Sequence, residues 1–229
     1  AYNDVTALER LLDRSFAGVM TEVIQGEGGL EAMSAEFAQA LNRLCRGHDV
    51  LLIADEVQTG LGRTGALFAS RELGLQADII TLAKPLAGGL PLAAALIPEK
   101  VNSLIHLGEH GTTFGGGPVT TAVASRACDL LSAPAFLANV RAKGEYLAVR
   151  LAGLAGSCPF LGAVKGRGLL LGLEVRLEAL AKTPRLAEAP DPTAELLVVF
   201  RDAGLLILRS GLDVLRIAIP LLCYFLLMF

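Results

Sequence analysis

The sequence predicts an α/β fold with a mostly parallel sheet, followed by a smaller α+β domain. Short apolar runs at Gly18 to Ile24, Val50 to Ala54 and Ile79 to Leu82 are typical of buried strands. Helical segments separate these runs, and strands that alternate with helices form parallel sheets covered on both faces. Because 53% of the residues are hydrophobic and only 19% are charged, the chain can bury a core of this kind.

Capping residues and apolar spacing predict the elements of the first half. Ser34 begins a helix with Glu36 in its first turn and Gly47 at its exit. Leu67 to Leu73 is expected to form a shorter helix, and Leu92 to Ile97 a strand after a glycine turn. These elements belong to the large domain, which we expect over residues 1–125.

The second half, residues 126–229, is expected to be the small domain. Apolar residues recur at helical spacing from Leu137 to Leu154, which predicts a long amphipathic helix ending at Gly156. The other expected elements are helices at Thr120 to Leu131 and Thr193 to Ala203, and strands at Leu169 to Val175 and Leu205 to Leu208. The division falls close to the first of these helices.

Charge and cysteine usage narrow the kinds of partner. The net charge of −3 and the absence of a Lys/Arg-dense stretch leave no electrostatic footprint for nucleic acid, so small molecules are expected. Neither a disulfide framework nor a metal site is predicted, because cysteines and histidines lack the spacing of ligands. These residues are Cys45, Cys128, Cys158, Cys223, His48, His106 and His110.

The two ends of the chain are unusual. The sequence opens in what looks like domain sequence without an initiator Met, which indicates a truncated chain. Ile217 to Phe229 is almost uniformly apolar, yet it falls short of the roughly 20 residues that a bilayer span needs. We interpret it as a final core strand running into an artefactual end, such as a frameshift, rather than a peripheral anchor. No membrane partner is expected.

Two predicted strands end on groups of opposite charge. Asp55 follows Val50 to Ala54, and Lys84 follows Ile79 to Leu82. Ligands of open α/β sheets bind at the carboxyl ends of strands. An amine and a carboxylate there suit pyridoxal phosphate, with Lys84 forming the Schiff base and Asp55 keeping the ring nitrogen protonated. The alternative interpretation is a lysine that reaches solvent and an aspartate that caps a helix.

Four segments carry a resemblance to a known family. They read T-E-V-I-Q-G-E-G-G from Thr21, D-E-V-Q-T-G-L-G-R-T-G from Asp55, T-L-A-K-P-L-A-G-G from Thr81 and G-T-T-F-G-G-G-P from Gly111. In this order they resemble the class III aminotransferases, which are fold-type-I pyridoxal-phosphate enzymes. Within that class the likeness is greatest to acetylornithine aminotransferases, and ornithine and 4-aminobutyrate aminotransferases are near relatives. Only the second half of the family pattern is present.

The resemblance implies roles for residues near the cofactor. It makes Lys84 the catalytic lysine and Asp55 the partner of the ring nitrogen, with Val57 packing on the ring and Gln58 approaching its phenolic oxygen. Packing at a strand end is an equal alternative for Val57.

The glycine-flanked Thr112 and Thr113 would reach the phosphate of the neighbouring subunit's cofactor. That role implies a homodimer with a shared active site. A plain turn is the competing interpretation, more so for Thr112.

The resemblance also implies substrate-binding residues. Glu27 would neutralise Arg216 while the ω-amine donor is bound, then swing away so that Arg216 grips the α-carboxylate of glutamate. Glu22 is interpreted as a carboxylate lining the site. The alternative interpretations are that Glu27 is a solvated loop glutamate and that Arg216 is an arginine at a strand edge.

The family pattern implies an activity: transfer of the terminal amino group of acetylornithine to 2-oxoglutarate, giving glutamate, in arginine biosynthesis. Ornithine or 4-aminobutyrate specificity is an alternative. The family's phosphate-binding loop, ring-stacking aromatic residue and second substrate arginine would all lie upstream of Ala1, so a catalytically silent fragment is the other hypothesis. The expected compartment is the cytoplasm, with the mitochondrial matrix as the alternative.

Overall fold

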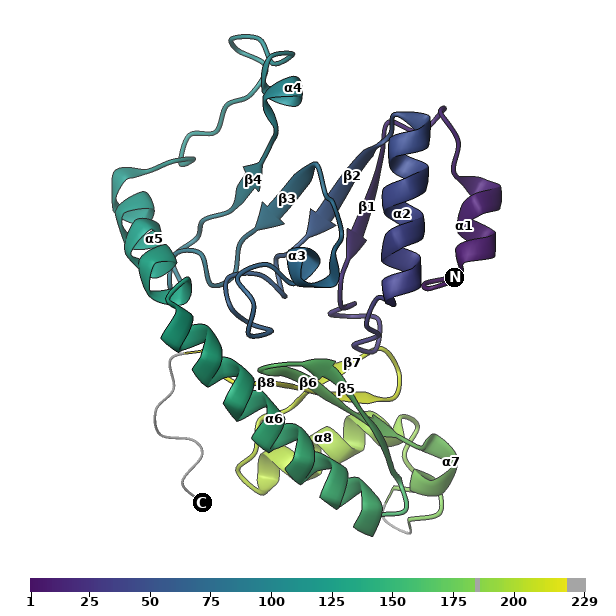
Figure 1. Cartoon of the computed structure of the whole chain (residues 1–229). Coiled ribbons are helices and arrows are strands. Elements are labelled where there is room, and N and C mark those ends of the chain that lie inside the picture. Colours follow the sequence, from purple (N-terminus) through teal and green to yellow (C-terminus); the bar gives the residue numbers. More distant parts are fainter. Residues whose placement is uncertain (184–185, 222–229) are drawn as a thin grey trace. The chain divides into compact units, whose positions relative to one another are not determined.

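The computed structural model describes residues 1–183 and 186–221. The chain forms two compact units (Figure 1). Unit 1 comprises residues 1–23, 33–62 and 66–137, and unit 2 comprises residues 24–32, 63–65 and 138–229. Two short segments of the first half therefore belong to unit 2, so the units do not follow a single division of the chain.

The sheet of unit 1 has the order β1-β2-β3-β4. Strands β1, β2 and β3 are parallel, whereas β4 is antiparallel to β3. The strands are Gly18–Glu22 (β1), Leu51–Asp55 (β2), Ile79–Leu82 (β3) and Ala94–Leu96 (β4). The predicted mostly parallel sheet is confirmed, and β3 has the predicted bounds. The strand expected over Leu92 to Ile97 is shorter than predicted.

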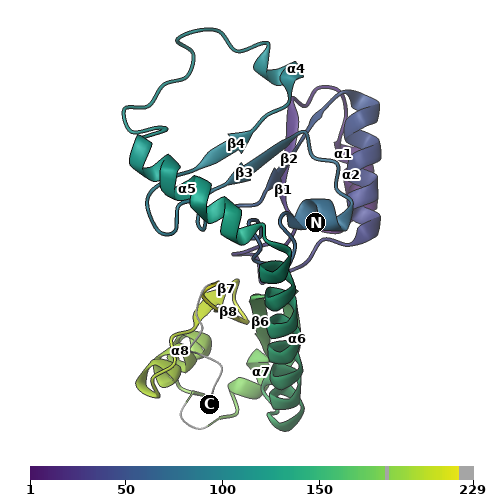
Figure 2. The same ribbon diagram turned by 60° about the vertical axis from the view of Figure 1, so that its left-hand side comes forward.

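The helices of unit 1 are Val5–Leu11 (α1), Ala35–His48 (α2), Ala69–Leu73 (α3), Glu99–Asn102 (α4) and Pro118–Leu131 (α5). Helix α1 packs against α2, and α2 contacts β2 (Figure 2). As predicted, the Ser34 hydroxyl caps α2 by accepting a hydrogen bond from the Phe37 amide. The predicted exit at Gly47 is wrong by one residue, because the helix continues to His48 and Asp49 takes the left-handed conformation there.

The sheet of unit 2 has the order β5-β6-β8-β7, with every pair antiparallel. Its strands are Leu161–Arg167 (β5), Leu170–Val175 (β6), Leu208–Ser210 (β7) and Val214–Ala218 (β8). Its helices are Leu177–Leu180 (α7) and Pro192–Asp202 (α8), and helix α6, Pro134–Ser157, begins in unit 1 and continues in unit 2. The main core of this unit includes Leu171, Leu173, Leu180, Leu196 and Leu215.

Two predictions in unit 2 need correction. The strand expected over Leu205 to Leu208 begins only at Leu208, because pairing with β8 starts there. Strand β5 escaped prediction, since Gly162 and Gly166 interrupt its apolar pattern and a register irregularity follows Leu161.

Two glycines allow close main-chain approach in unit 2. A Cβ atom on Gly144 of α6 would lie 2.5 Å from the Gly168 carbonyl oxygen, and one on Gly168 would lie 2.6 Å from the Thr64 carbonyl carbon. Gly168 also has a φ of +58°, which disfavours other residues. Helix α6, the β5–β6 turn and residues 63–65 are thus in contact through backbone atoms.

Arg63 holds the short segment 63–65 within unit 2. Its Nη1 donates hydrogen bonds to the carbonyl oxygens of Leu169, over 3.2 Å, and of Ile219. Burial lowers the pKa of the Arg63 guanidinium.

The apolar end of the sequence is described only in part. Ile217 and Ala218 belong to β8, whereas residues 222–229, including Cys223, lie outside the described residues. In the described part of the chain, no helix is both long and apolar enough to cross a membrane.

Candidate active site

The strand register of unit 1 brings two predicted site residues, Glu22 and Asp55, into one row with Thr81. Glu22 at the end of β1 pairs with Asp55 at the end of β2, and Asp55 pairs with Thr81 of β3. Residues paired across neighbouring strands share a face of the sheet, so the three side chains project in the same direction. The row lies at the carboxyl end of the parallel strands, where α/β proteins bind ligands.

Asp55 is held by two hydrogen bonds. Its Oδ1 accepts from the Val57 amide over 3.0 Å and from the Thr81 hydroxyl over 3.1 Å. Its Oδ2 accepts no hydrogen bond from any residue of the described ranges. A half-buried carboxylate whose second oxygen makes no hydrogen bond in the described ranges can accept a hydrogen bond from an N–H group of a ligand.

Lys84 lies two residues beyond the end of β3, in the turn that leads to Gly88 and Gly89. It is exposed, and it follows Thr81 by three residues. Both glycines have positive φ angles, which fit a tight turn. The structure therefore places the predicted amine and the predicted carboxylate at the ends of adjacent strands of one sheet.

Val57 and Gln58 occupy the turn after β2, and both are half-buried. The neighbouring Glu56, which is almost wholly buried, anchors this turn. Its carboxylate accepts hydrogen bonds from the Thr59 hydroxyl over 2.5 Å and from the Ser70 amide over 2.7 Å. Glu56 thereby fixes the backbone that carries Val57 and Gln58.

Thr112 and Thr113 are exposed in the loop between α4 and α5. Neither hydroxyl makes a hydrogen bond within the described ranges, and neither is brought into contact with Asp55. Their proposed role at a neighbouring subunit's cofactor stays a prediction.

Glu27 lies at the tip of a small hairpin in unit 2. Ile24 and Ala32 form an antiparallel bridge at its base, and the Gln25 amide donates to the Glu31 carbonyl oxygen over 2.9 Å. Leu30 is fully buried with residues of β6 and β8, which anchors the hairpin in that unit.

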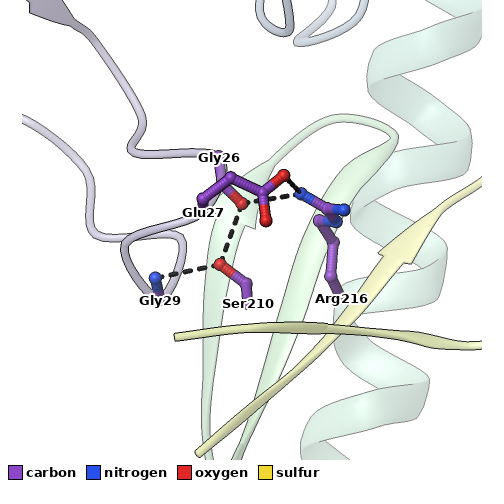
Figure 3. A network of polar contacts seen from close by, with 5 residues as sticks. All are labelled: Gly26, Glu27, Gly29, Ser210 and Arg216. Carbon is purple, nitrogen blue, oxygen red and sulfur yellow. Dashed lines mark hydrogen bonds and ion pairs between the residues drawn. The ribbon is translucent and has the colours of Figure 1, made fainter. Parts of the chain in front are cut away.

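Arg216 of β8 forms an ion pair with Glu27. Its Nη1 also donates to the Gly26 carbonyl oxygen over 2.8 Å (Figure 3). The Arg216 side chain is 11% exposed, whereas that of Glu27 is 71% exposed. The structure thus brings together the two residues that sequence analysis paired, and it gives them unequal access to solvent.

Sequence reasoning missed Thr81, Gly26 and Ser210. Thr81 carries a weak signal, since it is a polar residue between apolar Ile80 and Leu82 of a buried strand. Ser210 carries none, because its hydrogen-bond partner Gly29 is 181 positions away.

A parallel sheet that presents a carboxylate and a lysine at one edge is what a pyridoxal-phosphate transferase requires. The chain belongs to the class III aminotransferase family, whose model matches residues 1–224. Members of this family depend on pyridoxal phosphate.

Three comparisons refine the relationship. The chain is 42% identical, over 221 residues, to the acetylornithine aminotransferase of Neisseria meningitidis serogroup A; the match covers 96% of this chain and 53% of that protein. The crystal structure of N-acetylornithine aminotransferase from Stenotrophomonas maltophilia matches with a TM-score of 0.81 and 34% identity, covering 96% of this chain and 56% of that one. Ornithine aminotransferase from Plasmodium yoelii matches with a TM-score of 0.85 and 30% identity, covering 97% and 56%.

The chain spans about half the length of the curated relative that it matches. Within that half, the residues of unit 1 fit pyridoxal phosphate. Asp55 has an oriented carboxylate oxygen that could accept a hydrogen bond from a ring N–H, and the exposed Lys84 has an amine at the same sheet edge.

Proposed function

We propose that the protein is a pyridoxal-phosphate-dependent aminotransferase that moves the terminal amino group of acetylornithine to 2-oxoglutarate, giving glutamate, in arginine biosynthesis. One observation carries the proposal: Asp55 of β2 pairs with Thr81 of β3 and accepts a hydrogen bond from it. Because Lys84 follows Thr81 by three residues, the carboxylate and the amine lie at the same ends of adjacent strands. The 42% identity to an acetylornithine aminotransferase supports the choice of donor.

Pyridoxal phosphate, when bound, supplies an electron-withdrawing ring that stabilises negative charge on the carbon bearing the amine. Asp55 would keep the ring nitrogen protonated through its Oδ2, which makes no hydrogen bond in the described ranges. Lys84 would hold the group covalently through its Nζ, and the same amine would serve as the base that takes up a proton. Val57 would pack against the ring, and Gln58 would bind near the phenolic oxygen.

Carboxylate binding is assigned to the pair in unit 2. Arg216 stays neutralised by Glu27 while the donor's terminal amine reacts, and it binds the α-carboxylate of glutamate when Glu27 turns away. Glu22, which shares the face of Asp55, lines the site. The exposed Thr112 and Thr113 would bind the phosphate of a second subunit's cofactor, which makes the protein a homodimer.

Ornithine is the second candidate donor, because the Plasmodium yoelii ornithine aminotransferase structure superposes with a TM-score of 0.85. The family resemblance implies that a phosphate-binding loop, a ring-stacking aromatic residue and a second substrate arginine lie upstream of Ala1, so a catalytically silent fragment is the alternative proposal. A cytoplasmic location is proposed with the bacterial relative in view.

A labelling experiment tests the proposal. The purified chain is incubated with pyridoxal phosphate, reduced with borohydride and digested, and the labelled peptide is identified by mass spectrometry. We expect the label on Lys84, followed by glutamate formation from 2-oxoglutarate with acetylornithine faster than with ornithine. An unlabelled chain, beside a labelled Neisseria meningitidis relative, would identify a silent fragment.

A further inference from the structure

Ser210 lies at the centre of the contacts that hold the loop carrying Glu27. It is the last residue of β7 and is only 1% exposed. Its Oγ accepts a hydrogen bond from the Gly29 amide over 2.9 Å and donates one to the Gly26 carbonyl oxygen over 2.8 Å (Figure 3). One buried hydroxyl therefore satisfies a donor and an acceptor on either side of Glu27.

The main chain of Glu27 is also fixed. The Gly211 amide donates to the Glu27 carbonyl oxygen over 2.8 Å. Gly211 has a φ of +63°, and a Cβ atom there would lie 3.3 Å from the Gly29 nitrogen. The β7–β8 turn thus holds the main chain of the loop that carries Glu27. Any movement of Glu27 is therefore expected in its side chain, which is exposed to solvent.

Arg216 is in the opposite situation. Its guanidinium is largely buried and bonds both the Glu27 carboxylate and the Gly26 carbonyl oxygen. When the Glu27 side chain turns away, the Gly26 carbonyl is the contact that keeps Arg216 in position. Ser210 donates to that same carbonyl oxygen, so its hydroxyl helps to fix the direction in which the carbonyl points.

We infer that Ser210 is a positioning residue for Arg216: its hydroxyl orients the Gly26 carbonyl, which keeps the guanidinium ready for an incoming carboxylate after Glu27 leaves. The inference rests on the proposed function, in which Arg216 binds the α-carboxylate of the acceptor half-reaction. Ser210 touches neither substrate nor cofactor in this scheme and acts through Gly26.

A first test requires no activity. Nuclear magnetic resonance of the arginine side chains compares Glu27→Ala with the double variant Glu27→Ala/Ser210→Ala. We expect slow rotation of the Arg216 guanidinium in the single variant and rotation about tenfold faster in the double variant, as loss of a buried hydrogen bond implies. Equal rotation rates in the two proteins would overturn the inference.

Two further variants separate positioning from stability. Ser210→Thr keeps the hydroxyl on a side chain that strands accommodate, and in the Glu27→Ala background it should preserve slow rotation. Ser70→Ala removes a buried hydroxyl that has no hydrogen-bond partner in the described ranges, and should leave Arg216 unchanged. Faster rotation in the Ser70 variant would show that general loosening, not Ser210, controls the arginine.

Kinetics supply the second test. Ser210→Ala should raise the KM for 2-oxoglutarate about tenfold and leave the KM for acetylornithine within about twofold, because only the acceptor uses Arg216 in this scheme. An equal rise in both KM values would contradict the positioning role. A wild-type chain without transaminase activity would refute the proposed function, while the magnetic resonance comparison would still decide the role of Ser210.

Discussion

The hydroxyl of Thr81 donates a hydrogen bond to Oδ1 of Asp55 over 3.1 Å, between residues that are paired in the register of β2 and β3. The Val57 amide binds the same oxygen from the turn that follows β2. The carboxylate is therefore oriented by the strand beside it and by the turn after it before any ligand arrives. Such support reduces the ordering that binding would otherwise require.

Thr81→Val tests this support, because valine keeps the branched shape and loses the donor. We expect the Kd for pyridoxal phosphate to rise about tenfold or more, because a hydrogen bond to a charged group contributes about 1.5–3 kcal/mol. Fluorescence titration of the chain with the cofactor measures it. Asp55→Asn should weaken binding more than Thr81→Val does, and the reverse order would contradict the assigned geometry.

Lys84→Arg keeps a positive charge but replaces an amine that can deprotonate with a guanidinium that cannot. The rate of glutamate formation should fall at least about a hundredfold, since Lys84 moves a proton in the proposed reaction. Borohydride reduction should then leave no label. Lys100→Arg is the matched control, because Lys100 pairs with Asp78, the residue before β3. This variant should keep both the rate of glutamate formation and the borohydride-dependent label.

Arg216→Lys replaces a planar fork of donors with a single ammonium group. The KM for 2-oxoglutarate should rise about tenfold or more, as expected when a bidentate contact with a carboxylate is lost. Steady-state kinetics at several acceptor concentrations measure it. Arg209→Lys changes an arginine of β7 that pairs with Asp191, and an equal effect there would argue against a specific role for Arg216.

Asp78 makes stability depend on pH. Burial raises the pKa of the Asp78 carboxyl. The Leu52 amide, 2.9 Å away, and Lys100, 2.6 Å away, together lower that pKa by more than burial raises it, so it lies below the ordinary value. A group with a depressed folded-state pKa stabilises the fold above its unfolded pKa of about 3.9, and the contribution is lost as pH falls through the folded value.

Asp78→Asn should therefore lower the free energy of unfolding by about 1–3 kcal/mol at neutral pH. It should also flatten the loss of stability on acidification, because one carboxylate that resists protonation in the fold has been removed. Urea unfolding at neutral and acidic pH measures both effects. An equally steep acid dependence in the variant would mean that other carboxylates dominate.

Gly144→Ala should destabilise the protein although alanine favours helices. The new Cβ would lie 2.5 Å from the main-chain oxygen of Gly168, and such overpacking costs about 1–3 kcal/mol. Gly153→Ala in the same helix is the control, since nothing lies within 4 Å of its Cβ position. It should stabilise the protein by up to about 1 kcal/mol, and thermal unfolding should move the two variants in opposite directions.

The sequence predicted what local pattern determines. Residues close together in the sequence determine three of the confirmed features. These are the apolar run before Lys84, the capping hydroxyl of Ser34 and the helical spacing of apolar residues in α6. It could not predict where β7 begins, because exposed Leu205 and Leu206 resemble a strand and only pairing with β8 selects Leu208. Nor could it predict that Gly26 binds Ser210, since loop backbone carries no periodicity.

Because Ile24, Leu30 and Arg63 belong to unit 2, a protein fragment that begins at residue 138 would not contain the whole of that unit. Such an excised piece would lack the two apolar side chains that cluster with Leu170 and Val214, and the guanidinium that binds the Leu169 carbonyl. Anyone who wishes to transplant this unit onto another scaffold must carry three separated stretches of coding sequence, or restore continuity by circular permutation.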